Sequence, residues 1–228
     1  IFQPQMDHLV CFVPGMLALG ASGETADEEM ELAERLMETC YRMYSEQPTG
    51  LAPEICSFKG RGVPAVEQAK HCLLRPETVE SLFILWRTTG RQRYREMGWA
   101  IFSSIERHAK IVGGGYSGVR DVTTPAHRPL QYTGRMESFF TAETLKYLWL
   151  LFGDGSHVPL DQYVLNTEAH PILIHKDYRW GGQWGSLPDV SELTQAIHNE
   201  TSRHAAERAE MRHFAAARIR ALEQLSHH

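Results

Sequence analysis

One short segment, residues 73–81 (LLRPETVES), concentrates groups that can do chemistry in a chain otherwise rich in amphipathic helix patterns. Arg75 and Pro76 come directly before two carboxylates, Glu77 and Glu80. Proline is favoured at the first positions of a helix, and side chains three positions apart lie on the same helix face. The segment therefore predicts a helix that begins near Pro76 and presents both acids on one face.

Further acids lie in apolar or helix-start surroundings, where a solvated charge is not expected: Asp7, Glu54, Glu137, Glu143 and Glu168. Inverting glycoside hydrolysis uses such groups, because one acid protonates the leaving oxygen and another, about 6.5–9.5 Å away, activates water. Each acid alone also has a structural explanation: Glu77 can complement the helix dipole, and Glu80 can pair with Arg75. Only the acids as a set favour an active site.

Two other residue types could serve a sugar site. Thr167, in the segment NTEAHP, offers a hydroxyl and a backbone carbonyl near acids that could hold water, a combination that suits a hard cation such as calcium. Phe139, beside Glu137, could present an aromatic face to a sugar. The alternatives are an ordinary strand threonine and ordinary core packing.

The elements that must position these residues are mostly helical. Apolar residues recur at helical spacing over 6–20, 29–44, 76–90, 92–110, 136–153 and 191–225, while 113–117 and 163–175 have turn or strand character. Successive helix pairs predict stacked helical hairpins, which either close into a toroid or stay open as a solenoid. The composition changes after about residue 190, where Ala, Arg, Glu and His dominate and predict an appended, solvated helix.

Charge and cysteine content limit the function class. The net charge of -5 over 228 residues argues against a nucleic-acid partner, and no apolar run reaches the roughly 20 residues of a membrane span. Because an apolar helical pattern begins within a few residues of Ile1, we expect a fragment of a longer polypeptide. Cys11 and Cys40 lie on successive predicted helices and are either a disulfide or buried thiols. Together with the sequon at Asn199, they favour the secretory pathway.

Four segments together, MDHLVCFVPGMLALG, LLRPETVESLFILWRTTG, MESFFTAETLKYLWLLF and VLNTEAHP, resemble the class I α-1,2-mannosidases of glycoside hydrolase family 47. The resemblance covers residues 6 to about 175. It implies an all-α fold, the C-terminal half of an (α/α)7 barrel with a small β-hairpin plug, and a disulfide between Cys11 and Cys40. Residues 1–180 would be the C-terminal part of the catalytic domain, followed by a linker and a charged helix over 181–228.

The same resemblance implies roles for individual residues. Glu77 would be the general base, and Thr167 would bind Ca2+ through its carbonyl and hydroxyl. The mannose subsite would be lined by Arg75, Glu80, Glu137, Phe139 and Glu168, and the motifs of Asp7, His8 and Glu54 would approach the same cavity. The general acid and any membrane anchor would lie outside this chain.

The implied activity is calcium-dependent, inverting removal of terminal α-1,2-linked mannose from high-mannose N-glycans in the endoplasmic reticulum or Golgi. Two alternatives come from other classes. The chain could be a mannose-binding module that no longer cleaves, or an inactive helical fragment that keeps only the fold. A second open point is the pair Cys56 and Cys72, which could form another disulfide or remain free thiols.

Overall fold

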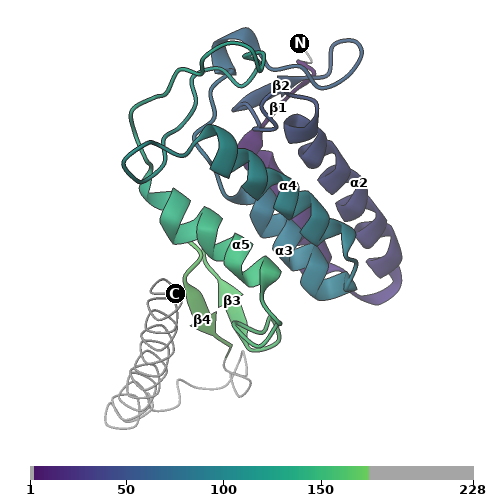
Figure 1. The fold of residues 1–228 in the computed structure, drawn as a ribbon. Coiled ribbons are helices and arrows are strands. Elements are labelled where there is room, and N and C mark those ends of the chain that lie inside the picture. The colour runs from purple at the N-terminus through teal and green to yellow at the C-terminus, as the bar shows by residue number, and fades with distance from the viewer. Residues whose placement is uncertain (1–2, 175–228) are drawn as a thin grey trace, which may run out of the picture. The chain divides into compact units, whose positions relative to one another are not determined.

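The computed structural model describes residues 3–174. In this part of the chain, α-helices dominate and the strands form two short antiparallel pairs (Figure 1). The predicted helix over 191–225, the linker and appended helix over 181–228 and the sequon at Asn199 lie outside the described residues.

The helices confirm the predicted order of helical hairpins. A 3-10 helix, η1 (His8–Phe12), leads into α1 (Val13–Gly20), and a second one, η2 (Gly23–Thr25), leads into α2 (Ala26–Ser45). The next hairpin consists of α3 (Glu77–Thr89) and α4 (Arg93–His108), and a π-helical turn, η4 (Phe140–Thr144), leads into α5 (Leu145–Phe152). Gly90 ends α3 with φ 68°, a left-handed conformation that glycine adopts without steric cost.

Helix α3 is the centre of the described structure. Its side chains from Thr78 to Leu85 are buried apart from Glu80, so apolar contacts surround it rather than covering one stripe. Helix α1 approaches it closely at Gly15, whose amide donates to Ser81 Oγ at 2.9 Å. A Cβ atom at Gly15 would lie 2.9 Å from Ile84 Cδ1 and 3.2 Å from the backbone Cα atom of Ser81, so a larger residue would need the Ile84 side chain and the α3 backbone to shift.

The first strand pair corrects the predicted start of the first helix. Residues 5–7 form β1 (Gln5–Asp7), which pairs antiparallel with β2 (Ile55–Ser57), and helical structure begins only at His8. The Asp7 side chain caps η1 by accepting a hydrogen bond from the amide of Leu9 at 2.9 Å. The pairing partner of β1 lies about fifty residues away, so local periodicity could not reveal it.

The second strand pair was predicted. Strands β3 (Tyr163–Leu165) and β4 (Pro171–Leu173) form an antiparallel hairpin whose turn carries the NTEAHP segment. The other segment, 113–117, belongs to a glycine-rich turn. Lys110, just before the turn, and Tyr116 make an isolated antiparallel bridge across it. The predicted helix over 136–153 begins at Ser138, because residues 136 and 137 still belong to the preceding loop.

The four cysteines divide into a bonded pair and two free thiols. Cys11 of η1 and Cys40 of α2 form a disulfide with a Cα–Cα distance of 5.8 Å. Cys56 and Cys72 are free and buried, so the alternative of a second disulfide is wrong. Burial raises the pKa of each of these two thiols to about 12, which keeps them protonated and unreactive.

Several apolar side chains of the described part face outward. Phe12, Met16 and Leu19 form a stripe along η1 and α1, and Trp99 and Trp149 flank a cavity of about 330 Å³ between α4 and α5. Such exposed faces are expected where helices belong to a larger barrel. No helix among residues 3–174 is long and apolar enough to cross a membrane.

The disulfide predicts a measurable contribution to stability. Replacing Cys11 and Cys40 together by alanine should lower the free energy of unfolding by about 3 to 4 kcal/mol. The reason is that the unfolded chain, no longer closed into a loop by the disulfide, regains conformational entropy. Chemical denaturation with and without reductant measures this effect. Wild type should lose stability on reduction, whereas the double variant should not. The variant Cys56→Ala is the control and should keep its response to reductant; equal stability of wild type and double variant would contradict the prediction.

Candidate active site

The N-terminal end of α3 is built on a strained turn. Pro76 precedes the helix and Glu77 is its first residue, as predicted from the sequence. Just before them Leu74 has φ 62°, which is uncommon for a residue with a branched side chain. The hydroxyl of Thr144 donates to the carbonyl of Leu74 at 2.7 Å and so holds the turn against η4. The turn aims Arg75 and Glu77 into the site.

Glu77 is a largely buried carboxylate that keeps its charge. Its Oε2 atom lies 2.8 Å from Nδ1 of His8. Burial by itself would raise the pKa of Glu77, but the hydrogen bond from His8 and the nearby positive charge of Arg75 outweigh burial and lower it below its usual value. An ionised carboxylate at neutral pH is what a general base requires.

His8 reaches Glu77 because of the β1–β2 pairing. The amide of His8 donates to the carbonyl of Glu54 at 2.8 Å, directly beyond the last paired residues, Asp7 and Ile55. The His8 ring is buried, and its Nε2 atom lies 2.7 Å from the hydroxyl of Tyr44 on α2. Three segments that are distant in sequence therefore fix one imidazole ring.

Arg75 pairs with Glu54, which corrects the alternative that Glu80 is its partner. The Nε atom of Arg75 lies 2.5 Å from Oε2 of Glu54, and the other carboxylate oxygen accepts the amide of Leu73 at 3.2 Å. The guanidinium carbon lies 5.6 Å from the centre of the Phe139 ring, within the range of a cation–π contact. One side of the site is therefore a continuous surface formed by Glu54, Arg75 and Phe139.

Glu80 and Glu143 lie in the same electrostatic environment as Glu77. The hydroxyl of Tyr147 donates to Oε1 of Glu80 at 3.1 Å. Burial, and then the negative charges of Glu77 and Glu143, raise the pKa of Glu80 to about 7. Burial followed by the charges of Glu77 and Glu168 also raises the pKa of Glu143. Acids from α3, η4 and the β-hairpin therefore influence one another.

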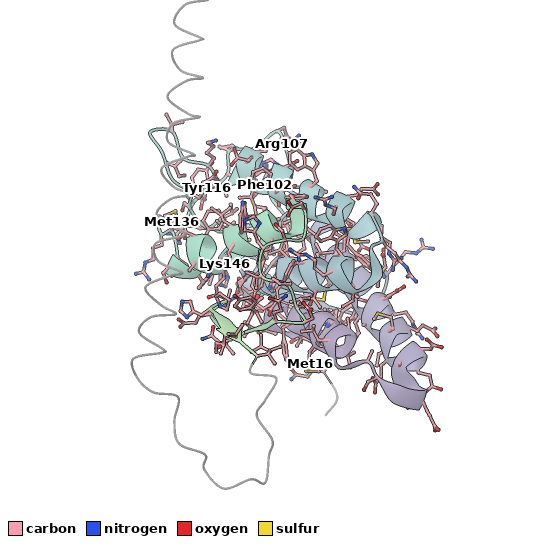
Figure 2. The ribbon with its side chains drawn as sticks, turned by 90° about the horizontal axis from the view of Figure 1, so that it is seen from below. Met16, Phe102, Arg107, Tyr116, Met136 and Lys146 are labelled. Atoms are coloured by element: carbon pink, nitrogen blue, oxygen red, sulfur yellow. A yellow bond between two sulfur atoms is a disulfide. The ribbon has the colours of Figure 1, made fainter. Side chains whose placement is uncertain are left out.

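The β-hairpin turn is held under α5. The side chain of Asn166 accepts the amides of Glu168 and His170 at 3.0 and 2.9 Å, which closes the turn. Lys146 of α5, labelled in Figure 2, donates to the carbonyl of Ala169 at 2.8 Å. Thr167 is exposed at the tip. No described residue makes a hydrogen bond to its hydroxyl or to its carbonyl, so both oxygens can bind a cation.

A cation at this tip would have only oxygen ligands. Within residues 3–174, no three His, Cys, Asp or Glu side chains come close enough to hold a metal ion. The donors that Thr167 offers, supplemented by water, suit calcium rather than zinc. Carboxylates that influence each other in this region, including Glu143 and Glu168, are suited to hold such water.

Two of the predicted site residues, Asp7 and Glu137, have fewer contacts with the other residues of the site. The side chain of Asp7 caps η1, and its charge still acts on Arg75. Glu137 is half-buried at the start of the helical turn, where its carbonyl accepts the amide of Phe140 at 3.1 Å. Among the described residues, the Glu137 carboxylate has no hydrogen-bond or ion-pair partner.

The structure also brings in residues to which the sequence assigns no role. Tyr147 lies four positions after Glu143, a spacing that places both on one helix face and could have indicated a shared environment. Tyr44 gave no such signal, because it belongs to a helix far from His8 in the sequence. Thr144 likewise acts through a contact with Leu74 that local pattern does not reveal.

Comparison with known proteins agrees with this geometry. The family model for glycosyl hydrolase family 47 matches residues 1–174. A human endoplasmic reticulum mannosyl-oligosaccharide 1,2-alpha-mannosidase is 51% identical over 180 residues, which cover 76% of this chain and 26% of that protein. A mannosyl-oligosaccharide 1,2-alpha-mannosidase of Arabidopsis thaliana is 46% identical over 209 residues, which cover 77% of this chain and 33% of that protein.

A solved structure supports the fold. The alpha-1,2-mannosidase from Trichoderma reesei matches with a TM-score of 0.68 and 29% sequence identity, over 76% of this chain and 40% of that one. This match confirms the predicted barrel-type helical fold. The chain spans only about a quarter to a third of the length of the curated relatives described above. By the family match over most of its length, the chain belongs to glycosyl hydrolase family 47.

Proposed function

We propose that this chain supplies the C-terminal part of a calcium-dependent, inverting α-1,2-mannosidase that trims high-mannose N-glycans. The observation that carries the proposal is Glu77, a largely buried carboxylate whose pKa is lowered by the hydrogen bond with His8. The relatives named as mannosyl-oligosaccharide 1,2-alpha-mannosidases support the substrate class.

In this mechanism Glu77 is the general base. Its Oε2 atom is occupied by His8, which leaves Oε1 to accept a proton from a water molecule. The water attacks the anomeric carbon from the face opposite the leaving oxygen, so the configuration inverts. The leaving oxygen takes a proton from a general acid, which we place in the part of the barrel that precedes this chain.

The neighbouring residues would form the mannose subsite. Arg75, held by Glu54 and lying over Phe139, presents donors in a fixed position, and Phe139 offers an aromatic surface. Glu80, Glu137 and Glu168 would accept hydrogen bonds from sugar hydroxyls, with Asp7 at the edge of the site. These roles rest on the family resemblance together with the positions described above.

Thr167 would hold the calcium ion. The fit is supported by two oxygens without a partner among the described residues and by the surrounding acids, whose pKa values are raised by burial and then by the negative charges of neighbouring acids. When bound, Ca2+ would supply a positive centre that orders water and sugar hydroxyls. Glu143 and Glu168 would orient the water molecules around it.

The place of action would be the secretory pathway, in the endoplasmic reticulum or Golgi. The disulfide between Cys11 and Cys40 supports an oxidising compartment, and the human relative is named for the endoplasmic reticulum. The partners would be glycoproteins that carry high-mannose glycans, and any attachment to a membrane would come from an anchor outside this chain.

The base assignment predicts a specific loss of catalysis. In the complete barrel enzyme that contains this chain, Glu77→Gln should lower kcat by at least about a hundredfold while glycan binding changes little, because the amide cannot accept the proton. Hydrolysis of an α-1,2-linked mannobiose and calorimetric binding of the same sugar measure the two quantities.

The control is Glu106→Gln, which changes a carboxylate on α4 that pairs with Lys110. It should retain wild-type kcat. Full activity of Glu77→Gln would refute the base assignment. A wild-type enzyme that binds the sugar but does not cleave it would instead favour the mannose-binding module.

The calcium assignment predicts a change in thermal stability. Because a bound ion stabilises only the folded state, adding calcium should raise the melting temperature of the wild-type complete barrel enzyme. Thr167→Ala removes the hydroxyl and should reduce that rise, whereas the control Thr25→Ala, on η2, should leave it unchanged. Melting curves over a calcium titration measure the effect, and an equal response of wild type and Thr167→Ala would overturn the site.

The raised pKa of Glu80 predicts a pH effect in calcium-free buffer. Its native pKa of about 7 lies above the ordinary value of 4.5, so the folded state binds the proton more tightly than the unfolded state. The stability that this proton contributes is complete below about pH 4.5 and is lost as the pH rises through about 7. Glu80→Gln, which does not titrate, should therefore become more stable relative to wild type over this range. A difference in denaturation midpoint between wild type and Glu80→Gln that stays constant from pH 4.5 to 8 would contradict the prediction.

A further inference from the structure

We propose that Tyr44 is a positioning residue that selects the tautomer of His8, with the proton on Nδ1 facing Glu77. The His8 ring is only 2% exposed, so water does not complete its hydrogen bonds. Its contacts are Glu77 at Nδ1 and the hydroxyls of Tyr44 and Thr78 at Nε2. The choice of tautomer therefore depends on these three groups.

The Glu77 contact places a proton on Nδ1. An ionised carboxylate can only accept hydrogen bonds, and the separation of 2.8 Å between Oε2 and Nδ1 is a hydrogen-bond distance. In the opposite neutral tautomer the lone pair of Nδ1 would face the negative oxygen. That arrangement would remove the hydrogen bond that keeps Glu77 ionised.

In the neutral form of the ring, a proton on Nδ1 leaves Nε2 as an acceptor that needs a donor, and Tyr44 is the better placed donor. Its hydroxyl lies 2.7 Å from Nε2, whereas the hydroxyl of Thr78 lies at 3.3 Å. Burial raises the pKa of Tyr44 well above its ordinary value, so the phenol keeps its proton. The two rings meet edge to face at 68°, which leaves the hydroxyl directed at the ring nitrogen rather than stacked on the ring.

The disulfide joins the segment of His8 to the helix of Tyr44. Cys11 lies three residues after His8, and Cys40 lies four residues, about one helical turn, before Tyr44. The covalent bond therefore ties together the two segments that carry the hydrogen-bonded pair. A residue on the long helix α2 can in this way orient a ring beside the general base without touching the substrate.

This inference rests on the proposed function only for the role of Glu77 as base, because the tautomer itself can be observed directly. The experiment uses the complete barrel enzyme labelled with 15N in the histidine rings, with the His8 signals identified by their loss in His8→Gln. In wild type, Nδ1 should carry the proton and Nε2 should not. In Tyr44→Phe, which deletes only the hydroxyl, the His8 signals should shift toward the other tautomer, and kcat should fall roughly tenfold or more with little change in KM.

The matched control is Tyr94→Phe, which deletes another buried phenol hydroxyl, on α4 and hydrogen-bonded to Arg93. It should leave the His8 signals and kcat as in wild type even if it lowers the melting temperature. Thr78→Val should move the His8 signals less than Tyr44→Phe, in keeping with its longer distance.

Two results would overturn the inference: a proton on Nε2 in wild type, or unchanged His8 signals and unchanged kcat in Tyr44→Phe. A wild-type enzyme that shows the Nδ1 proton but does not hydrolyse α-1,2-linked mannose would refute the proposed function and support the tautomer assignment. The two failures are therefore distinguishable.

Discussion

A carboxylate taken out of water keeps its charge only when a hydrogen-bond donor compensates for the lost hydration, and Glu77 depends on that condition. His8 supplies the donor, and the rest of the site is arranged around this contact. The β1–β2 pairing sets the position of His8, the turn at Leu74 sets the position of Glu77, and α2 contributes Tyr44 behind the ring. These elements together place the donor that lowers the pKa of the candidate base.

The other acids of the site have less compensation. Glu80 has a hydrogen bond from Tyr147, yet burial and neighbouring negative charge still raise its pKa. The pKa of Glu143 is raised for the same two reasons. Negative charges from α3, η4 and the β-hairpin turn therefore gather where the family resemblance implies a cation and sugar hydroxyls. The hairpin is attached to α5 through Lys146, so the position of Thr167 is coupled to the helix that also carries Tyr147.

Stability and site geometry use the same contacts. The disulfide between Cys11 and Cys40 joins the segment of His8 to the helix of Tyr44, and the close approach of α1 to α3 at Gly15 keeps that segment against Glu77. The outward-facing apolar stripe on η1 and α1 is consistent with a chain that forms only part of a larger barrel. The site is thus supported by covalent, packing and hydrogen-bond constraints from elements that are remote in sequence.

The mostly helical fold, the hairpin over 163–175 and the start of α3 next to Pro76 could be predicted from the sequence, because helical periodicity, turn residues and proline act over a few positions. The candidate acids could be identified for the same local reason, and the family resemblance supplied their proposed roles. The three-dimensional fold was needed to show that Glu54 rather than Glu80 pairs with Arg75, that Cys56 and Cys72 stay free, and that residues 5–7 form a strand. It also decided the contacts of Tyr44, Thr144 and Tyr147 and the pKa shifts of Glu77 and Glu80. Those properties depend on burial and on partners far along the chain, which no local pattern encodes.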